Sequence, residues 1–155
     1  MEVIIRDLQP NDAKISYKWR NDPEVWKQTG RKWNNLVTEE IEEQWIRAVI
    51  KKPNEKRFAI CVGKDLKYIG NVQLTGITKI EGTFHIFIGD KEFWGKGIGT
   101  KATQLILSFA KRELSLHRVN LFVKKGNIAA IKVYEKVGFK SGKTLGEDIL
   151  MTMNL

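Results

Sequence analysis

"EFWGKGIGTKA", residues 92–102, places three glycines at alternate positions between an apolar run and the start of a helical pattern. Gly95, Gly97 and Gly99 let the backbone approach a ligand closely, and they allow several N–H groups to point into one concavity. The helix that follows adds the positive end of its dipole. The stretch therefore indicates either an anion site, most naturally for phosphate, or a tight structural turn, and the glycines alone leave both open.

The periodicity on either side of this loop predicts one mixed α/β domain over residues 1–155. Apolar alternation predicts strands, and an apolar stripe repeating every three or four residues predicts helices. The order is roughly β-α-α-β-β-β-α-β-α-β-β, with three successive antiparallel strands in the middle. We expect strands at 3–8, 57–62, 67–77, 82–89, 118–124 and 148–155, and helices at 10–22, 38–52, 99–114 and 127–137.

The helical stripes also predict which side chains face the core. Thr38 is placed to cap the second helix, and Gly138 to end the fourth. The inward residues are expected to be Ile15 and Trp19, with Tyr17 as a further candidate, then Ile41, Trp45, Ala48 and Val49, and then Ala102, Leu105, Ile106, Phe109 and Ala110.

Composition favours a globular protein in a reducing compartment. Hydrophobic residues make up 42% of the 155 residues and charged residues 29%, and no apolar run approaches the length of a membrane span. The N-terminus lacks the basic start and long apolar stretch of a signal peptide. Cys61 is the one cysteine, which excludes an intrachain disulfide and a thiolate metal site. We expect a cytoplasmic protein without a membrane segment or a metal.

The positive charge is concentrated in one part of the chain. The net charge is +9, and residues 91–143 hold twelve Lys and Arg against three acids. A basic region of this kind predicts an anionic partner, which is a nucleic acid, a polyphosphate cofactor or an acidic surface. A solvated, lysine-rich face is the alternative.

A second group of residues lies in "NIAAIKVYEKVGF", 127–139. Asn127 and Tyr134 are seven residues apart, close to two helical turns, so both lie on one face of the helix. A tyrosine beside a reacting group can donate a proton. The structural alternative is that Asn127 caps the helix and Tyr134 packs in the core.

Together and in this order, the two stretches resemble the GCN5-related N-acetyltransferase (GNAT) superfamily. "WGKGIG" (94–99) is similar to that family's coenzyme loop Gln/Arg-x-x-Gly-x-Gly/Ala, with Trp94 as a departure at the first position. The family's later signature is matched by Asn127, Ala130, Tyr134, Gly138 and Phe139. The resemblance implies the GNAT fold, a twisted, mostly antiparallel sheet of six to seven strands with about four helices. It also implies an acetyl-coenzyme A-dependent N-acetyltransferase.

The resemblance further implies roles for individual residues. The pantetheine arm would pair with strand 84–89 where that strand diverges from 118–124, and Tyr134 would protonate the departing thiolate. His85 is the candidate base, with Glu81 or a water relay as alternatives. Lys101, Lys132 and Lys136 are candidates for the phosphates. The other implied cofactor residues are Phe87, Ile88, Trp94, Gly95, Lys96, Gly97, Ile98, Gly99, Thr100, Asn127 and Ala130.

The acceptor is expected to be a small-molecule amine bound by the N-terminal third. Aromatic and cationic side chains there suit a nucleotide-linked amino sugar, and "WRNDPEVW" (19–26) is similar to a segment of bacterial acetyltransferases with such substrates. The candidate acceptor residues are Trp19, Arg20, Trp26 and Arg31. A polyamine, which the acids of "TEEIEEQW" would suit, and a protein N-terminus remain open. A non-enzymatic nucleic-acid binder is a distant alternative. We expect a monomer or homodimer without a nucleic-acid partner.

Overall fold

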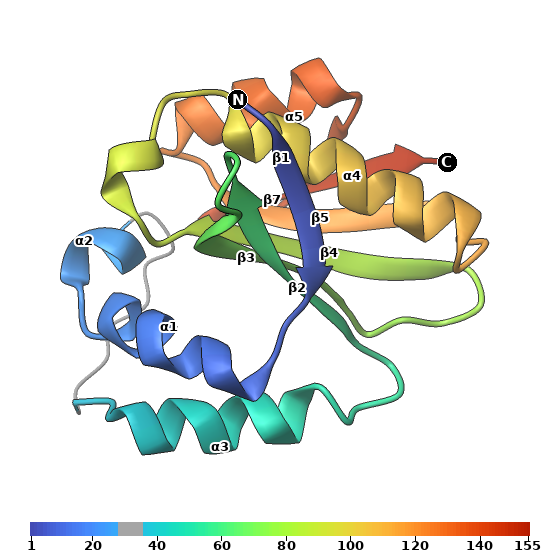
Figure 1. The fold of residues 1–155 in the computed structure, drawn as a ribbon. Coiled ribbons are helices and arrows are strands. Elements are labelled where there is room, and N and C mark those ends of the chain that lie inside the picture. The colour runs from blue at the N-terminus through green and yellow to red at the C-terminus, as the bar shows by residue number, and fades with distance from the viewer. Residues whose placement is uncertain (28–35) are drawn as a thin grey trace.

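A seven-stranded sheet forms the centre of the computed structural model, which describes residues 1–27 and 36–155 (Figure 1). Neighbouring strands follow the order β1-β2-β3-β4-β5-β7-β6. Each neighbouring pair is antiparallel except β4 and β5, which run parallel, so the expected mixed, mostly antiparallel sheet is confirmed. The strands are β1 (Val3–Asp7), β2 (Lys56–Val62), β3 (Lys67–Thr75), β4 (Glu81–Ile88), β5 (Arg118–Lys124), β6 (Lys140–Leu145) and β7 (Asp148–Asn154).

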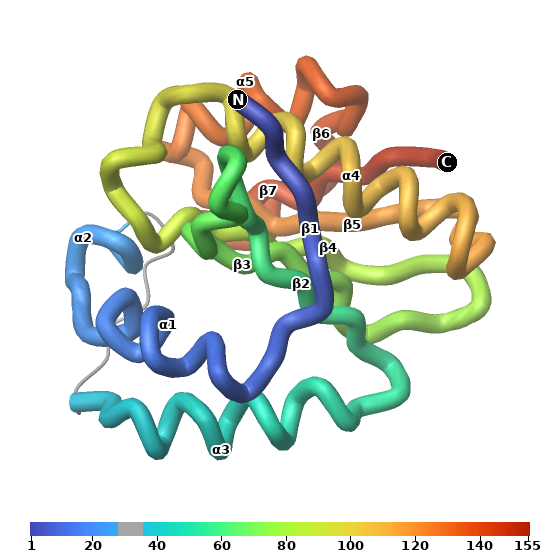
Figure 2. The backbone as a smooth tube through the Cα atoms, viewed as in Figure 1, coloured from blue at the N-terminus to red at the C-terminus, as the bar shows by residue number. Residues whose placement is uncertain are grey.

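Helices cover both faces of the sheet. The first three lie together against one face and the last two lie against the other, as both backbone views show (Figures 1 and 2). Among the described residues none of these helices is long and apolar enough to cross a membrane. The helices are α1 (Ala13–Arg20), α2 (Pro23–Trp26), α3 (Glu39–Val49), α4 (Ile98–Arg112) and α5 (Ile128–Val137), with short 3-10 turns η1 (Pro10–Asp12) and η3 (Lys91–Phe93).

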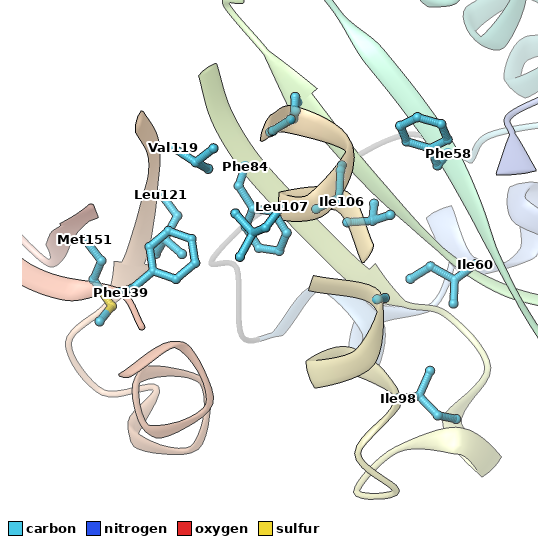
Figure 3. Close-up of a cluster of buried hydrophobic side chains, with 14 of the residues drawn as sticks. Phe58, Ile60, Phe84, Ile98, Ile106, Leu107, Val119, Leu121, Phe139 and Met151 are labelled. Atoms are coloured by element: carbon cyan, nitrogen blue, oxygen red, sulfur yellow. The ribbon is translucent and has the colours of Figure 1, made fainter. Parts of the chain in front are cut away.

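Each face of the sheet has its own hydrophobic core. The larger core lies under α4 and α5, where Phe84, Ile106 and Leu121 are buried together (Figure 3). The smaller core lies under α1, α2 and α3 and includes Trp19 and Ile46. Any cavity that passes through the sheet is therefore bounded by one group of helices on each face.

The inward faces of three helices differ from the sequence prediction. Ile15, Ile41, Ala48 and Leu105 are exposed, whereas Trp19, Val49, Ile106 and Ala110 are buried as expected. The reason is that polar residues belong to the buried faces. Ser16 and Arg20 of α1 point at the buried carboxylate of Glu42 on α3, and this pairing turns Ile15 and Ile41 toward solvent. In α4 the Thr103 hydroxyl donates to the Gly99 carbonyl, so a polar residue takes a core position that Leu105 was expected to hold.

The parallel pair β4 and β5 separates partway along its length. Within the described chain the two strands pair at 81–83 with 118–120, yet β4 continues to Ile88 and β5 to Lys124. The expected divergence of these strands is therefore present. It leaves an opening in the middle of the sheet that connects the α1–α3 side with the α4–α5 side.

The end of β4 packs directly against α1. A Cβ added at Gly89 would overlap the indole ring of Trp19, which is itself buried against Tyr68 at a ring separation of 4.8 Å. We predict that Gly89→Ala lowers the free energy of unfolding by about 1–3 kcal/mol, because the buried ring has no room to move aside. Urea denaturation measures this change.

The matched control is Gly126→Ala, since an added Cβ at Gly126 meets open space. We expect this variant to unfold at the wild-type urea concentration. Equal midpoints for the two alanine variants would contradict the close-packing argument for Gly89.

Candidate active site

A cavity of about 780 Å³ occupies the opening between β4 and β5. Residues from both sides of the sheet line it, so donor-side and acceptor-side candidates meet in one space. Nine of the residues singled out from the sequence are among its lining residues: Arg20, Trp26, His85, Phe87, Ile88, Trp94, Gly99, Asn127 and Tyr134.

The glycine loop ends in an open helix N-terminus beside this cavity. Gly95 and Gly97 adopt φ values of +71° and +77°, in the left-handed region that favours glycine. Gly97 is the N-cap residue of α4, and no side chain caps this end of the helix. A Cβ at Gly95, Gly97 or Gly99 would meet no atom within 4 Å. The loop therefore leaves room for an anion, and the N–H groups of the first turn of α4 lie beside that room.

The remaining loop candidates contribute in different ways. Ile98 is buried in the larger core, so its backbone rather than its side chain belongs to the loop surface. Thr100 is half-buried, and the Lys96 side chain is exposed with its ammonium 5.6 Å from the Phe93 ring. Among the phosphate candidates, the Lys101 ammonium donates to the Met1 carbonyl, while Lys132 and Lys136 are exposed on α5.

The edge of β4 presents backbone groups to the cavity. The Gly89 N–H donates to the Ile69 carbonyl of β3. In an antiparallel pair every second residue points its N–H and C=O groups at the neighbouring strand, so Phe87 and His85 also point theirs at β3. The N–H and C=O groups of Ile86 and Ile88 therefore point away from β3, toward the side where β5 has separated. These groups suit the amides of an extended chain such as pantetheine.

Trp94 ties the glycine loop to this strand edge. Its indole N–H donates to the Ile88 carbonyl oxygen at 2.7 Å, although the side chain is 41% exposed. The residue that departs from the family pattern thus makes a defined contact within the site. It occupies one strand-edge acceptor and leaves the N–H groups of Ile86 and Ile88 for a ligand.

Asn127 and Tyr134 lie on the donor side of the cavity. The Asn127 side chain accepts a hydrogen bond from the Ala130 N–H and so caps α5, and Ala130 itself is half-buried against the larger core. The Tyr134 ring packs edge-on against Phe84, and burial raises the pKa of its hydroxyl to about 12. Both structural alternatives from the sequence are present, yet each residue also lines the cavity, and the Tyr134 hydroxyl stays protonated.

His85 lies on the α1–α3 side of the opening. Its exposed ring is within hydrogen-bond distance of the Thr75 hydroxyl, 3.1 Å from Nε2 to Oγ1, and it lines the cavity. Glu81 lies at the start of β4, outside the cavity lining, and accepts hydrogen bonds from Arg118 and Asn120. These bonds lower the pKa of Glu81, so its carboxylate is a weaker base than an ordinary glutamate and is poorly placed for the cavity.

The α1–α3 side of the cavity carries two arginines over one tryptophan. The guanidinium carbons of Arg20 and Arg57 lie 4.4 and 5.0 Å from the Trp45 ring centre. Both carboxylates that line the cavity in the described chain are ion-paired, Glu55 with Arg57 at 2.9 Å and Asp148 with Lys124 at 3.0 Å. This wall also includes the polar side chains of Asn71, Gln73 and Thr75 from β3 and the apolar side chains of Leu8 and Val25.

One acceptor candidate lies outside the cavity lining, another falls outside the described residues, and several lining residues were not predicted. Trp19 is buried in the smaller core, apart from the cavity lining, and Arg31 falls outside the described residues. The residues that the sequence analysis missed include Trp45, Arg57 and Phe122. Phe122 could have been found, because the inward alternation of its neighbours in 118–124 turns it toward the opposite face.

Comparisons with known proteins agree with this geometry. The family model described as an acetyltransferase (GNAT) domain matches residues 2–140. An uncharacterized protein of Methanocaldococcus jannaschii is 26% identical over 144 residues, which are 92% of this chain and 29% of that protein. The probable N-acetyltransferase YjcK of Bacillus subtilis is 36% identical over 92 residues, which are 58% of this chain and 51% of that protein. The chain thus spans about half of one relative and less than a third of the other.

A solved structure extends the comparison to the whole fold. The spermidine N-acetyltransferase of Vibrio cholerae in complex with CoA and spermine superposes with a TM-score of 0.85 at 22% identity, covering 99% of this chain and 94% of that one. At this identity the similarity establishes the fold.

Proposed function

Because the chain belongs to the GNAT acetyltransferase family, whose cofactor is acetyl-coenzyme A, we propose that it transfers an acetyl group from this cofactor to the primary amine of a small molecule. One observation carries the proposal. A single cavity brings together the open N-terminus of α4, the unpaired edge of β4 and the protonated hydroxyl of Tyr134. The same cavity continues to the acceptor wall beneath α1–α3.

Residues at different places along the cavity have different roles. The cofactor supplies an acetyl group activated as a thioester. The N–H groups of the glycine loop and of the first turn of α4 would hold the pyrophosphate, with Lys96 and the cations of α5 nearby. The N–H groups of Ile86 and Ile88 would hold the pantetheine and polarise the acetyl carbonyl. His85 accepts the proton of the attacking amine, and Tyr134 donates a proton to the leaving sulfur.

The acceptor wall favours a polar, ring-bearing amine, such as a nucleotide-linked amino sugar, over a polyamine. A polycation needs carboxylates that are free to pair with it, whereas Glu55 and Asp148 already pair with Arg57 and Lys124. The aromatic side chains of Trp26 and Trp45, which line the same cavity, suit ring faces. The amide and hydroxyl groups of Gln73 and Thr75 suit sugar hydroxyls.

Coenzyme A is expected to raise the melting temperature of the protein by about 5–10 °C at a concentration near 100 times its dissociation constant. Thermal unfolding monitored by circular dichroism measures this shift. Substitution of Gly97 by valine removes it, because a branched side chain is strained at a φ of +77° and fills the anion space. The absence of any shift in the native protein would refute the acetyltransferase proposal.

An acetylation screen then identifies the acceptor. The panel contains nucleotide-linked amino sugars, spermidine, aminoglycosides and N-terminal peptides, and release of free thiol reports turnover. We expect the highest kcat/KM with an amino sugar nucleotide. Preferential turnover of spermidine would overturn the choice of acceptor while leaving the acetyltransferase proposal intact.

A further inference from the structure

Phe122 is an exposed aromatic residue in the middle of a core strand. Its neighbours on β5, Leu121 and Val123, are buried, but Phe122 itself is 51% exposed. Among the described residues the exposed large aromatic side chains are Phe122 and Trp94, the latter 41% exposed, and both line the cavity. The Trp94 indole donates a hydrogen bond to the edge of β4, which gives this side chain a place on the cofactor side of the site. The exposed ring of Phe122 has no role in the cofactor site described above.

The register places Phe122 across the opening from the candidate base. Thr83 of β4 and Asn120 of β5 are the last paired residues, and their side chains share a face of the sheet. Two residues further along each strand come His85 and Phe122, which keep that face because side chains alternate along a strand. Phe122 therefore lies where an amine attacking from the α1–α3 side would rest its carbon skeleton.

The surroundings of Phe122 suit a ring with polar edges. Leu150 of β7 is its cross-strand partner, and the ion pair of Lys124 and Asp148 lies further along the same strands. An aromatic face with a charged rim complements a planar or chair-shaped ring whose faces are apolar and whose edges carry hydroxyl or amide groups. A linear amine offers no such face.

We propose that Phe122 determines acceptor specificity by stacking against the ring of a cyclic amine and holding the amine beside His85. This inference rests on the proposed acetyltransferase function, and it narrows the substrate to ring-bearing amines. Stacking of a ring on an aromatic side chain typically changes affinity five- to about a hundredfold when that side chain is truncated to alanine.

The test compares Phe122→Ala, Phe122→Leu and Phe122→Tyr with a nucleotide-linked amino sugar and with spermidine as acceptors. The alanine and leucine variants should raise KM for the amino sugar about five- to a hundredfold, and the tyrosine variant should stay within about twofold of the native value. The dissociation constant of coenzyme A, measured by calorimetry, should stay the same in all three. Leu145→Ala is the control, because Leu145 is comparably exposed on β6, outside the cavity lining.

Three results would overturn the inference. These are a native KM in Phe122→Ala, a native KM in Phe122→Leu, and turnover of spermidine without turnover of any cyclic amine. Failure of the acetyltransferase proposal is visible separately, as the absence of coenzyme A binding in the native protein, and it would remove the basis of both proposals.

Discussion

Tyr134→Phe is expected to lower kcat by about 10²–10⁴-fold while the dissociation constant of coenzyme A changes less than about twofold. The substitution removes one oxygen atom and leaves the ring in place. That ring packs against Phe84 and Phe139 at centroid distances of 5.9 Å each, so the packing of α5 on the sheet is retained. Steady-state kinetics and calorimetric titration with coenzyme A provide the two measurements.

The pH dependence adds a second test of the same role. Burial raises the pKa of Tyr134 to about 12, so its hydroxyl carries a proton throughout the neutral and mildly alkaline range. We expect kcat of the native enzyme to show no loss from Tyr134 ionisation up to about pH 10. An unchanged kcat in Tyr134→Phe would exclude Tyr134 as the proton donor. A native profile that falls with a tyrosine ionisation near pH 10 would instead contradict the raised pKa of Tyr134.

The parts of the site that could be predicted from the sequence depend on short-range chemistry. The three glycines lie within one loop and the first turn of α4, and Asn127 and Tyr134 belong to one helix and its N-cap. Gly99, Asn127 and Tyr134 line the cavity. The order of the strands along the chain also followed from local alternation, since β1 to β5 lie close to their expected ranges. The cofactor side was therefore accessible from residues that are neighbours in the chain.

The acceptor side depends on contacts between distant segments and on buried charge. Trp45 was assigned to a core stripe, but it lines the cavity, and β2 and α1 bring Arg57 and Arg20 over its ring. Glu42 is one of the acids of "TEEIEEQW" that would suit a polyamine, yet the residue is 2% exposed and its carboxylate pairs with Arg20. A prediction from hydrophobic periodicity treats every charged residue as exposed. It therefore cannot identify a buried ion pair between two residues that are 22 positions apart, such as Arg20 and Glu42.

Glu42→Ala is expected to lower the free energy of unfolding by about 3–5 kcal/mol. The Glu42 carboxylate accepts hydrogen bonds from the Ser16 hydroxyl at 2.8 Å and from the Arg20 Nε at 3.2 Å. Its removal leaves the buried guanidinium of Arg20 without its carboxylate. The melting temperature should fall by about 6–20 °C, as measured by differential scanning calorimetry.

The matched control lies one residue further along the same helix. Glu43 pairs with Arg47 at 3.4 Å on the exposed side of α3, and Glu43→Ala should cost less than about 1 kcal/mol. If Glu42→Ala and Glu43→Ala have the same melting temperature, the buried pair of Glu42 and Arg20 does not stabilise the fold more than the exposed pair does.

The double variant Arg20→Met, Glu42→Leu separates stability from substrate recognition. Replacing both members of a buried pair by apolar residues of similar volume restores much of the lost stability, because no uncompensated charge remains. Arg20 also lines the cavity and lies over the rings of Trp45 and Trp26. We therefore expect the double variant to regain most of the melting temperature of the native protein while its KM for the acceptor stays elevated. A double variant that regains both the native melting temperature and the native KM would show that Arg20 only stabilises the fold. The acceptor would then be recognised by other residues of the wall.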